Sequence, residues 1–155
     1  LLDNGIRLRA IGERDFLPSS VRAALAQVEA DTAQCKDMEL ILAVSYDGRR
    51  DMVRAARHLA ELVKSGRLLT ADINETQLMS ALSTGGLPDV DLLIRTSGEI
   101  RTSGFLPLEA CYAELYFVET LWPDFLESDL DAALAEYARR QRRFGLTTDQ
   151  MAVNG

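Results

Sequence analysis

A short polar segment that follows an apolar run holds the residues best suited to chemistry in this sequence. Residues 90–94 read VDLLI, and residues 95–104 read RTSGEIRTSG, with two arginines, four hydroxyl side chains and two glycines. A guanidinium group offers a planar fork that matches phosphate oxygens, and hydroxyl groups and glycine N–H groups add further donors. Arg95, Arg101 and Ser103 are therefore candidates for an anion-binding loop. The alternative is a polar loop whose arginines pair with surface carboxylates.

Glu114 is a second candidate, because it opens the apolar and aromatic run ELYFV at residues 114–118. A carboxylate there could bind Mg²⁺, which prefers oxygen ligands and substrate phosphates. The alternative is an edge glutamate paired with an arginine. Arg49 follows another apolar run and could line the same cleft or cap a carboxylate. The sequence contains neither a P-loop nor a GxGxxG pattern, and its single histidine, His58, leaves no Ser-His-Asp triad.

Apolar runs and amphipathic stretches alternate along the chain and predict the elements that position these residues. Strands are expected at residues 6–11, 38–44, 90–94 and 114–118. Helices are expected to start at Ser19 or Ser20, near Asp51, at Asn74 and at Ser128. Strands separated by helices indicate crossover connections and a mostly parallel sheet flanked by helices. The fold class is therefore α/β, in a single domain over residues 1–155, with ligands expected beyond the carboxyl ends of the strands.

Composition narrows the class of protein further. The chain has 155 residues, and its 17 basic against 24 acidic side chains give a net charge of −7, which argues against a nucleic-acid partner. No apolar run reaches the ~20 residues that a membrane-spanning helix needs. Cys35 and Cys111 lack the spacing of a redox or metal motif, which is typical of reduced thiols in a cytoplasmic protein.

The beginning of the chain predicts that a preceding portion exists. The sequence opens without methionine on LLDNG, which is typical of the last turn of a helix that a glycine ends. We therefore expect an N-terminal portion upstream of residue 1.

Several segments together resemble the cis-prenyltransferase family, to which undecaprenyl diphosphate synthases belong. These are DLLIRTSGEIRTSGF at residues 91–105, YAELYF at 112–117 and LWPDF at 121–125, supported by NGIRLRAIG at 4–12, YDGRRD at 46–51 and RRFG at 142–145. The similarity covers nearly the whole chain in the family's order.

The resemblance implies a homodimeric enzyme that condenses isopentenyl diphosphate with an allylic prenyl diphosphate, with Mg²⁺ as cofactor, to make a polyprenyl diphosphate. It places Arg95, Arg101 and Ser103 on the diphosphate of isopentenyl diphosphate, and Glu114 on the acidic position linked to Mg²⁺ and the subunit contact. Arg143 and Gly145 match the element that reaches a diphosphate from the partner subunit. The lipid product implies contact with a membrane surface.

Three departures from the family pattern bear on activity. The family's motif with the principal Mg²⁺-binding aspartate is absent and is expected upstream, so the chain alone should be inactive. Ile100 stands where many bacterial members carry histidine, Gly104 stands where asparagine is usual, and residues 106–109 read LPLE in place of the usual sequence. The change at 106–109 permits a synthase of short or branched prenyl diphosphates. A non-catalytic subunit that binds prenyl diphosphates is the other alternative, and the intact Arg95, Arg101 and Ser103 argue against it.

Overall fold

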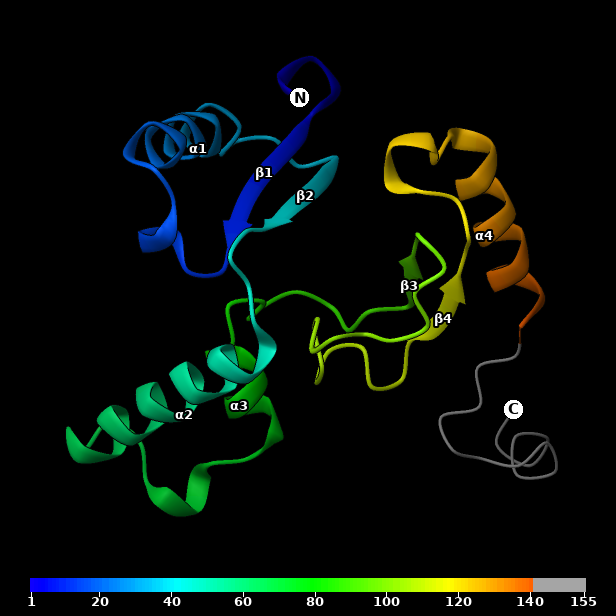
Figure 1. Cartoon of the computed structure of the whole chain (residues 1–155). Helices are drawn as coiled ribbons and strands as arrows, with labels where there is room; N and C mark the ends of the chain where they lie inside the picture. Colours follow the sequence, from blue (N-terminus) through cyan, green and yellow to red (C-terminus); the bar gives the residue numbers. More distant parts are fainter. Residues whose placement is uncertain (141–155) are drawn as a thin grey trace, which may run out of the picture. The chain divides into compact units, whose positions relative to one another are not determined.

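The computed structural model describes residues 1–140 and divides the chain into two compact units, Leu1–Leu87 and Pro88–Gly155. Each unit has its own pair of parallel strands and its own helices, as Figure 1 shows. The predicted α/β class with parallel pairing is confirmed. The single domain over residues 1–155 stays a prediction, and the two units are described separately below.

The first unit contains a two-stranded parallel sheet, β1 (Ile6–Ile11) and β2 (Met38–Ala43), joined through helix α1 (Ser19–Asp31). The register runs from Ile6 beside Met38 to Ile11 beside Ala43. The run MELILA suits a strand because branched and long apolar side chains pack well on a pleated surface. Both strands therefore end side by side, and the segments that follow them meet at one edge.

Helix α1 covers β1 and also satisfies its backbone. The N–H of Leu8 donates to Thr32 Oγ1 at 3.0 Å, and the N–H of Ala10 donates to Glu29 Oε1 at 2.7 Å. Thr32 is 1% exposed and also donates to the carbonyl of Val28 at 2.7 Å. Side chains of α1 and of the residue that follows it thus occupy two donors of β1.

Helices α2 (Gly48–Lys64) and α3 (Glu75–Ala81) complete the first unit, and a buried carboxylate connects them. Asp51, 6% exposed, lies in the first turn of α2. Its carboxylate accepts from the N–H of Ser83 and from its hydroxyl at 2.6 Å. Arg54 donates to the same carboxylate through Nε at 3.0 Å and Nη2 at 2.6 Å. The segment after α3 is therefore fixed to the beginning of α2.

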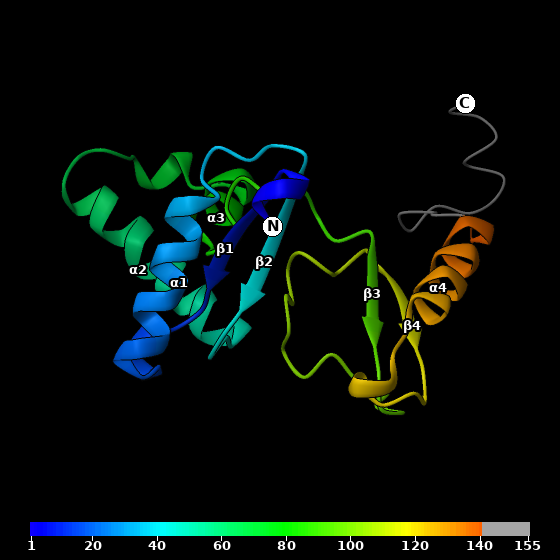
Figure 2. The same cartoon turned by 90° about the horizontal axis from the view of Figure 1, so that it is seen from above.

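The second unit pairs β3 (Leu92–Arg95) with β4 (Glu114–Phe117) in parallel, and helix α4 (Glu127–Arg139) runs beside β4 in Figures 1 and 2. The register places Leu92 beside Glu114 and Arg95 beside Phe117. In α4 only Ala133 is buried. Among residues 1–140, no helix is long and apolar enough to cross a membrane.

The observed helix starts agree with one of the predictions from sequence and correct two others. Asn74 does cap α3, because its side chain accepts from the N–H of Gln77 at 3.0 Å. Helix α2 begins at Gly48, earlier than expected, because Asp47 accepts from the N–H of Arg50 at 3.0 Å and serves as its cap. Ser128 was the wrong cap for α4, since it lies within the helix and Asp129 accepts from the N–H of Leu126 at 2.9 Å.

Candidate functional site

The three residues predicted to bind an anion lie together in the second unit. Arg95 ends β3, and its Nη1 donates to Ser103 Oγ at 3.1 Å and to the backbone carbonyl of Arg101. No hydrogen bond within residues 1–140 engages the Nε or Nη2 of Arg95. The structure therefore brings Arg95, Arg101 and Ser103 to the carboxyl end of a strand, with part of one guanidinium group available.

The backbone of this loop carries strain that favours a binding role. Ser97 and Ser103 have φ values of 69° and 51°, in the left-handed region that costs a non-glycine residue roughly 1–3 kcal/mol. The N–H groups of Ser97 and Gly98 donate to the carbonyls of Thr120 and Val118 at 2.9 and 3.0 Å. These two N–H groups are therefore occupied, which corrects the expectation that the glycine N–H at this position would add a donor.

The charge of the loop is partly compensated from within. Glu99 forms an ion pair with Nη1 of Arg101, and the two side chains are 39% and 61% exposed. Two arginines and one glutamate leave the loop with a charge of +1. A ligand anion can bind the remaining N–H donors of Arg101 or replace Glu99, because carboxylate and phosphate oxygens bind the same donors.

Glu114 lies at the other end of the β3–β4 ladder. The register pairs it with Leu92, three residues before Arg95, which is roughly 10 Å along a strand. Its carboxylate forms an ion pair with Nη1 of Arg140 at 3.1 Å, and the side chains are 25% and 34% exposed. The structure thus realises the second interpretation of Glu114, a glutamate paired with an arginine, and does not bring it to the arginine loop.

Within residues 1–140, Glu114 has few of the ligands that a magnesium ion needs. Among the described residues no group of three or more His, Cys, Asp or Glu side chains could hold a metal ion. Mg²⁺ commonly binds one or two carboxylates together with substrate phosphates. Here one carboxylate is already neutralised by a guanidinium group and lies away from the loop that would hold the phosphates. Residues 1–140 therefore contain no cluster of three or more such side chains, and the metal role of Glu114 stays a prediction.

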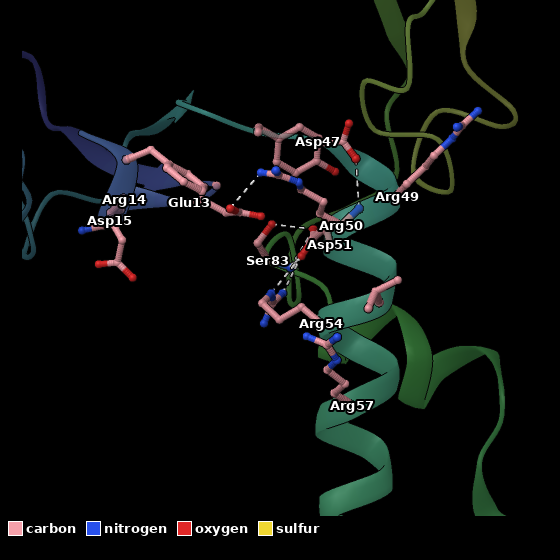
Figure 3. A pocket seen from close by; sticks show the side chains of 14 residues that line it. Glu13, Arg14, Asp15, Asp47, Arg49, Arg50, Asp51, Arg54, Arg57 and Ser83 are labelled. Atoms are coloured by element: carbon pink, nitrogen blue, oxygen red, sulfur yellow. Dashed lines mark hydrogen bonds and ion pairs between the residues drawn. The ribbon is translucent and has the colours of Figure 1, made fainter.

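A cavity of about 800 Å³ lies in the first unit where β1 and β2 end (Figure 3). Its walls come from the segments after the two strands and from one face of α2, and five of the lining side chains are arginines: Arg14, Arg49, Arg50, Arg54 and Arg57. The carboxyl ends of parallel strands are where ligands bind in α/β folds. Arg49 lines this cavity of the first unit, whereas the arginine loop belongs to the second, so its place in the same cleft as the loop stays a prediction.

Most of the charge in this cavity is paired internally. Arg50 binds Glu13 at 2.9 Å, and Arg14 binds Glu29 at 2.6 Å. The hydrogen bond from Arg14 lowers the pKa of Glu29 and raises the pKa of Arg14, against the opposing effect of burial on both. Figure 3 shows Arg50 and Arg54 turned toward their acidic partners.

Two arginines of the cavity differ from the others. The side chains of Arg49 and Arg57 have no ion-pair or hydrogen-bond partner among residues 1–140. Arg50, Arg54 and Arg57 were not among the predicted site residues, although their spacing of four and three residues places them on one helix face. That spacing was the signal that could have indicated an arginine-lined wall.

The structure describes only some of the remaining predicted positions. Arg143 and Gly145 lie outside the described residues. Ile100 is 76% exposed. Within the divergent stretch 106–109, Leu106 has a φ of 46° and Glu109 is 5% exposed, so these changes lie in structured backbone beside the arginine loop.

Comparison with known proteins gives consistent matches over nearly the whole chain. A family model described as "Putative undecaprenyl diphosphate synthase" matches residues 1–145. The isoprenyl transferase of Chlorobaculum tepidum is 44% identical over 154 residues, which is 99% of this chain and 58% of that protein. The ditrans,polycis-undecaprenyl-diphosphate synthase ((2E,6E)-farnesyl-diphosphate specific) of Pseudomonas aeruginosa is 46% identical over 149 residues, 96% of this chain and 59% of its own.

Two solved structures are also similar. Lavandulyl diphosphate synthase from Lavandula x intermedia, in complex with dimethylallyl diphosphate, matches with a TM-score of 0.86 and 43% identity over 90% of this chain and 60% of that one. A probable undecaprenyl diphosphate synthase from Campylobacter jejuni matches with a TM-score of 0.78 and 36% identity over 93% of this chain and 65% of its own. The chain thus spans less than two thirds of the length of these relatives.

Proposed function

The chain belongs to the cis-prenyltransferase family that includes the undecaprenyl diphosphate synthases, and on that premise we propose that the whole protein condenses isopentenyl diphosphate with an allylic prenyl diphosphate. The product of this reaction is a longer prenyl diphosphate, and the diphosphate of the allylic substrate is released. The observation that carries the proposal is the convergence of Arg95, Arg101 and Ser103 at the end of β3.

In this proposal the arginine loop binds the diphosphate of isopentenyl diphosphate. The free N–H groups of Arg95 donate to phosphate oxygens, Ser103 adds a hydroxyl donor, and Arg101 exchanges Glu99 for the ligand. Holding the diphosphate fixes the position of the isopentenyl double bond relative to the allylic carbon, and such positioning lowers the entropic part of the barrier. We propose Mg²⁺ as the cofactor of the whole protein, with ligands beyond those that residues 1–140 supply.

A homodimer in which Arg143 and Gly145 reach a diphosphate across the subunit contact belongs to the same proposal, as does contact of the lipid product with a membrane surface. A second candidate product comes from the likeness to lavandulyl diphosphate synthase, whose structure contains dimethylallyl diphosphate. The whole protein would then use dimethylallyl diphosphate in place of a longer allylic substrate.

The test is incorporation of labelled isopentenyl diphosphate by the whole protein, with farnesyl or dimethylallyl diphosphate as the second substrate, followed by mass analysis of the product. Replacing Arg95 by alanine should lower the rate by about 10²–10³-fold, since it removes a charge-assisted fork. Arg67→Ala is the matched control, because within residues 1–140 the side chain of Arg67 donates only to Ser65 Oγ, at 3.0 Å. Equal rates for the two variants would refute the role of Arg95. Tight binding of prenyl diphosphates without incorporation would indicate the non-catalytic subunit instead.

A further inference from the structure

The beginning of the arginine loop that follows β3 is attached to the segment that follows β4. The N–H of Val118 donates to the carbonyl of Arg95 at 3.0 Å, and the N–H of Gly98 donates to the carbonyl of Val118 at 3.0 Å. The N–H of Ser97 donates to the carbonyl of Thr120 at 2.9 Å. Three backbone hydrogen bonds therefore fix the beginning of the loop on the chain after β4.

Thr120 is an anchor that lies beyond the β3–β4 ladder, because β4 ends at Phe117, three residues earlier. Its hydroxyl donates to Asp129 Oδ1 at 3.4 Å, and the other carboxylate oxygen of Asp129 accepts from the N–H of Leu126 at 2.9 Å. Asp129 lies in the first turn of α4. One carboxylate therefore joins the start of this helix to the residue that anchors the loop.

The loop needs such anchors because its backbone is strained at Ser97. The φ of Ser97 is 69°, in the left-handed region that a non-glycine residue keeps only where its surroundings hold it. Gly98 follows with a φ of 65°, and a Cβ there would lie 2.5 Å from Glu119 Oε2. The residue next to Thr120 thus packs directly on the strained turn, so a shift of Thr120 would move the turn as well.

We propose that Thr120 and Asp129 are positioning residues for the arginine loop, and that their hydrogen bond raises the fraction of the loop in the conformation that binds a diphosphate. The inference rests on the proposed function in one respect, because the ligand is the diphosphate of isopentenyl diphosphate. Both residues act through the carbonyl that holds Ser97. A ligand that binds only the competent conformation has an apparent dissociation constant that rises as that fraction falls.

Loss of this hydrogen bond should therefore raise the KM for isopentenyl diphosphate and leave kcat nearly unchanged. The bound diphosphate itself holds Arg95 and Ser103, so the loop has the same conformation in the complex once the cost of ordering it is met. The variant T120V removes the hydroxyl with little change of shape and should raise KM about three- to fivefold, with kcat within about twofold of wild type. T120S keeps the hydroxyl and should leave KM within about 1.5-fold of wild type.

A second pair of variants separates the hydrogen bond from the charge of the helix. D129A should raise KM at least as much as T120V does, because it removes the acceptor. D131A is the matched control, since it removes the same charge two residues later in α4. Asp131 is exposed, and its side chain has no hydrogen bond or ion pair within residues 1–140, so KM should stay within about 1.5-fold of wild type.

Hydrogen exchange of the whole protein, followed by mass spectrometry, measures the loop without depending on activity. The amides of Ser97 and Gly98 should exchange at least about threefold faster in T120V than in wild type, T120S or D131A. Unchanged exchange or an unchanged KM in T120V would overturn the inference, and so would an effect of T120S or D131A as large as that of T120V. A whole protein that incorporates no isopentenyl diphosphate would refute the proposed function alone, because the exchange measurement still tests the anchor.

Discussion

Replacing Asp51 by alanine should destabilise the first unit far more than the same replacement of an exposed aspartate. The carboxylate is 6% exposed and accepts hydrogen bonds from the N–H and hydroxyl of Ser83 and from two nitrogens of Arg54. Alanine would leave the half-buried N–H and hydroxyl of Ser83 without an acceptor. The segment after α3 would then lose its attachment to α2.

The size of the effect follows from the exposure of each partner. Hydrogen bonds to a charged group contribute about 1.5–3 kcal/mol each when their partner is removed from water, which applies to Ser83. Arg54 has a side chain that is 54% exposed, so water replaces its partner and its share is about 0–1 kcal/mol. Because Ser83 is only half-buried, the lower end of these ranges applies, and the expected loss is about 3 kcal/mol, a substantial part of the roughly 5–15 kcal/mol by which domains are stable.

Urea unfolding followed by circular dichroism measures this loss. With a slope of about 2 kcal/mol per molar urea, the midpoint of Asp51→Ala should fall by about 1.5 M. The midpoint of Asp51→Asn should fall by about half as much, because the amide oxygen still accepts a hydrogen bond from Ser83. Asp72→Ala is the control, since Asp72 is exposed and should change stability by less than about 0.5 kcal/mol. A midpoint for Asp51→Ala equal to that of Asp72→Ala would refute the reasoning.

Three further predictions concern other contacts. The hydrogen bond from Arg14 lowers the pKa of Glu29. The contribution of this carboxylate to stability is therefore complete above its ordinary pKa of 4.5 and is lost as the pH falls below that value. Urea midpoints measured across this pH range should depend less on pH in Glu29→Gln than in wild type. Gly98→Ala places a Cβ 2.5 Å from Glu119 Oε2 at a φ of +65° and should lower the free energy of unfolding by about 1–2 kcal/mol. If backbone strain contributes more than the contact with Glu119, adding Glu119→Ala to this variant will not restore its urea midpoint. Thr32→Val leaves an N–H of β1 without its acceptor and should cost about 1–3 kcal/mol in thermal or urea unfolding, whereas an unchanged midpoint would show that water reaches that N–H.

The sequence predicted the local elements well because each depends on neighbouring residues. The run MELILA and the cap at Asn74 are local signals, and both elements are present as expected. The start of α2 comes before the expected position near Asp51, because Asp47, a residue type found both in turns after strands and at helix caps, caps this helix with its carboxylate. The same residue type suits both roles, and only the backbone that follows decides between them.

The arginine loop could be predicted from the sequence because its residues lie in one segment that directly follows a strand. Arg95 and Ser103 are eight residues apart in one loop, and their contact needs no distant element. The partner of Glu114 could not be predicted, because Arg140 is 26 residues later and its position depends on the length and packing of α4. The sequence offered both a metal and an arginine as partners, and spacing alone does not distinguish them.

The hydrogen bonds from β1 to Thr32 and Glu29 also decide how this sheet can grow. An edge strand normally exposes a row of N–H and C=O groups on which another chain can pair, and such pairing leads to aggregation. Two of the donors of β1 are taken by side chains, so this side of the ladder is closed to a foreign strand. Any additional strand, from the same polypeptide or another, would have to pair with β2, so only one edge of this ladder can extend the sheet.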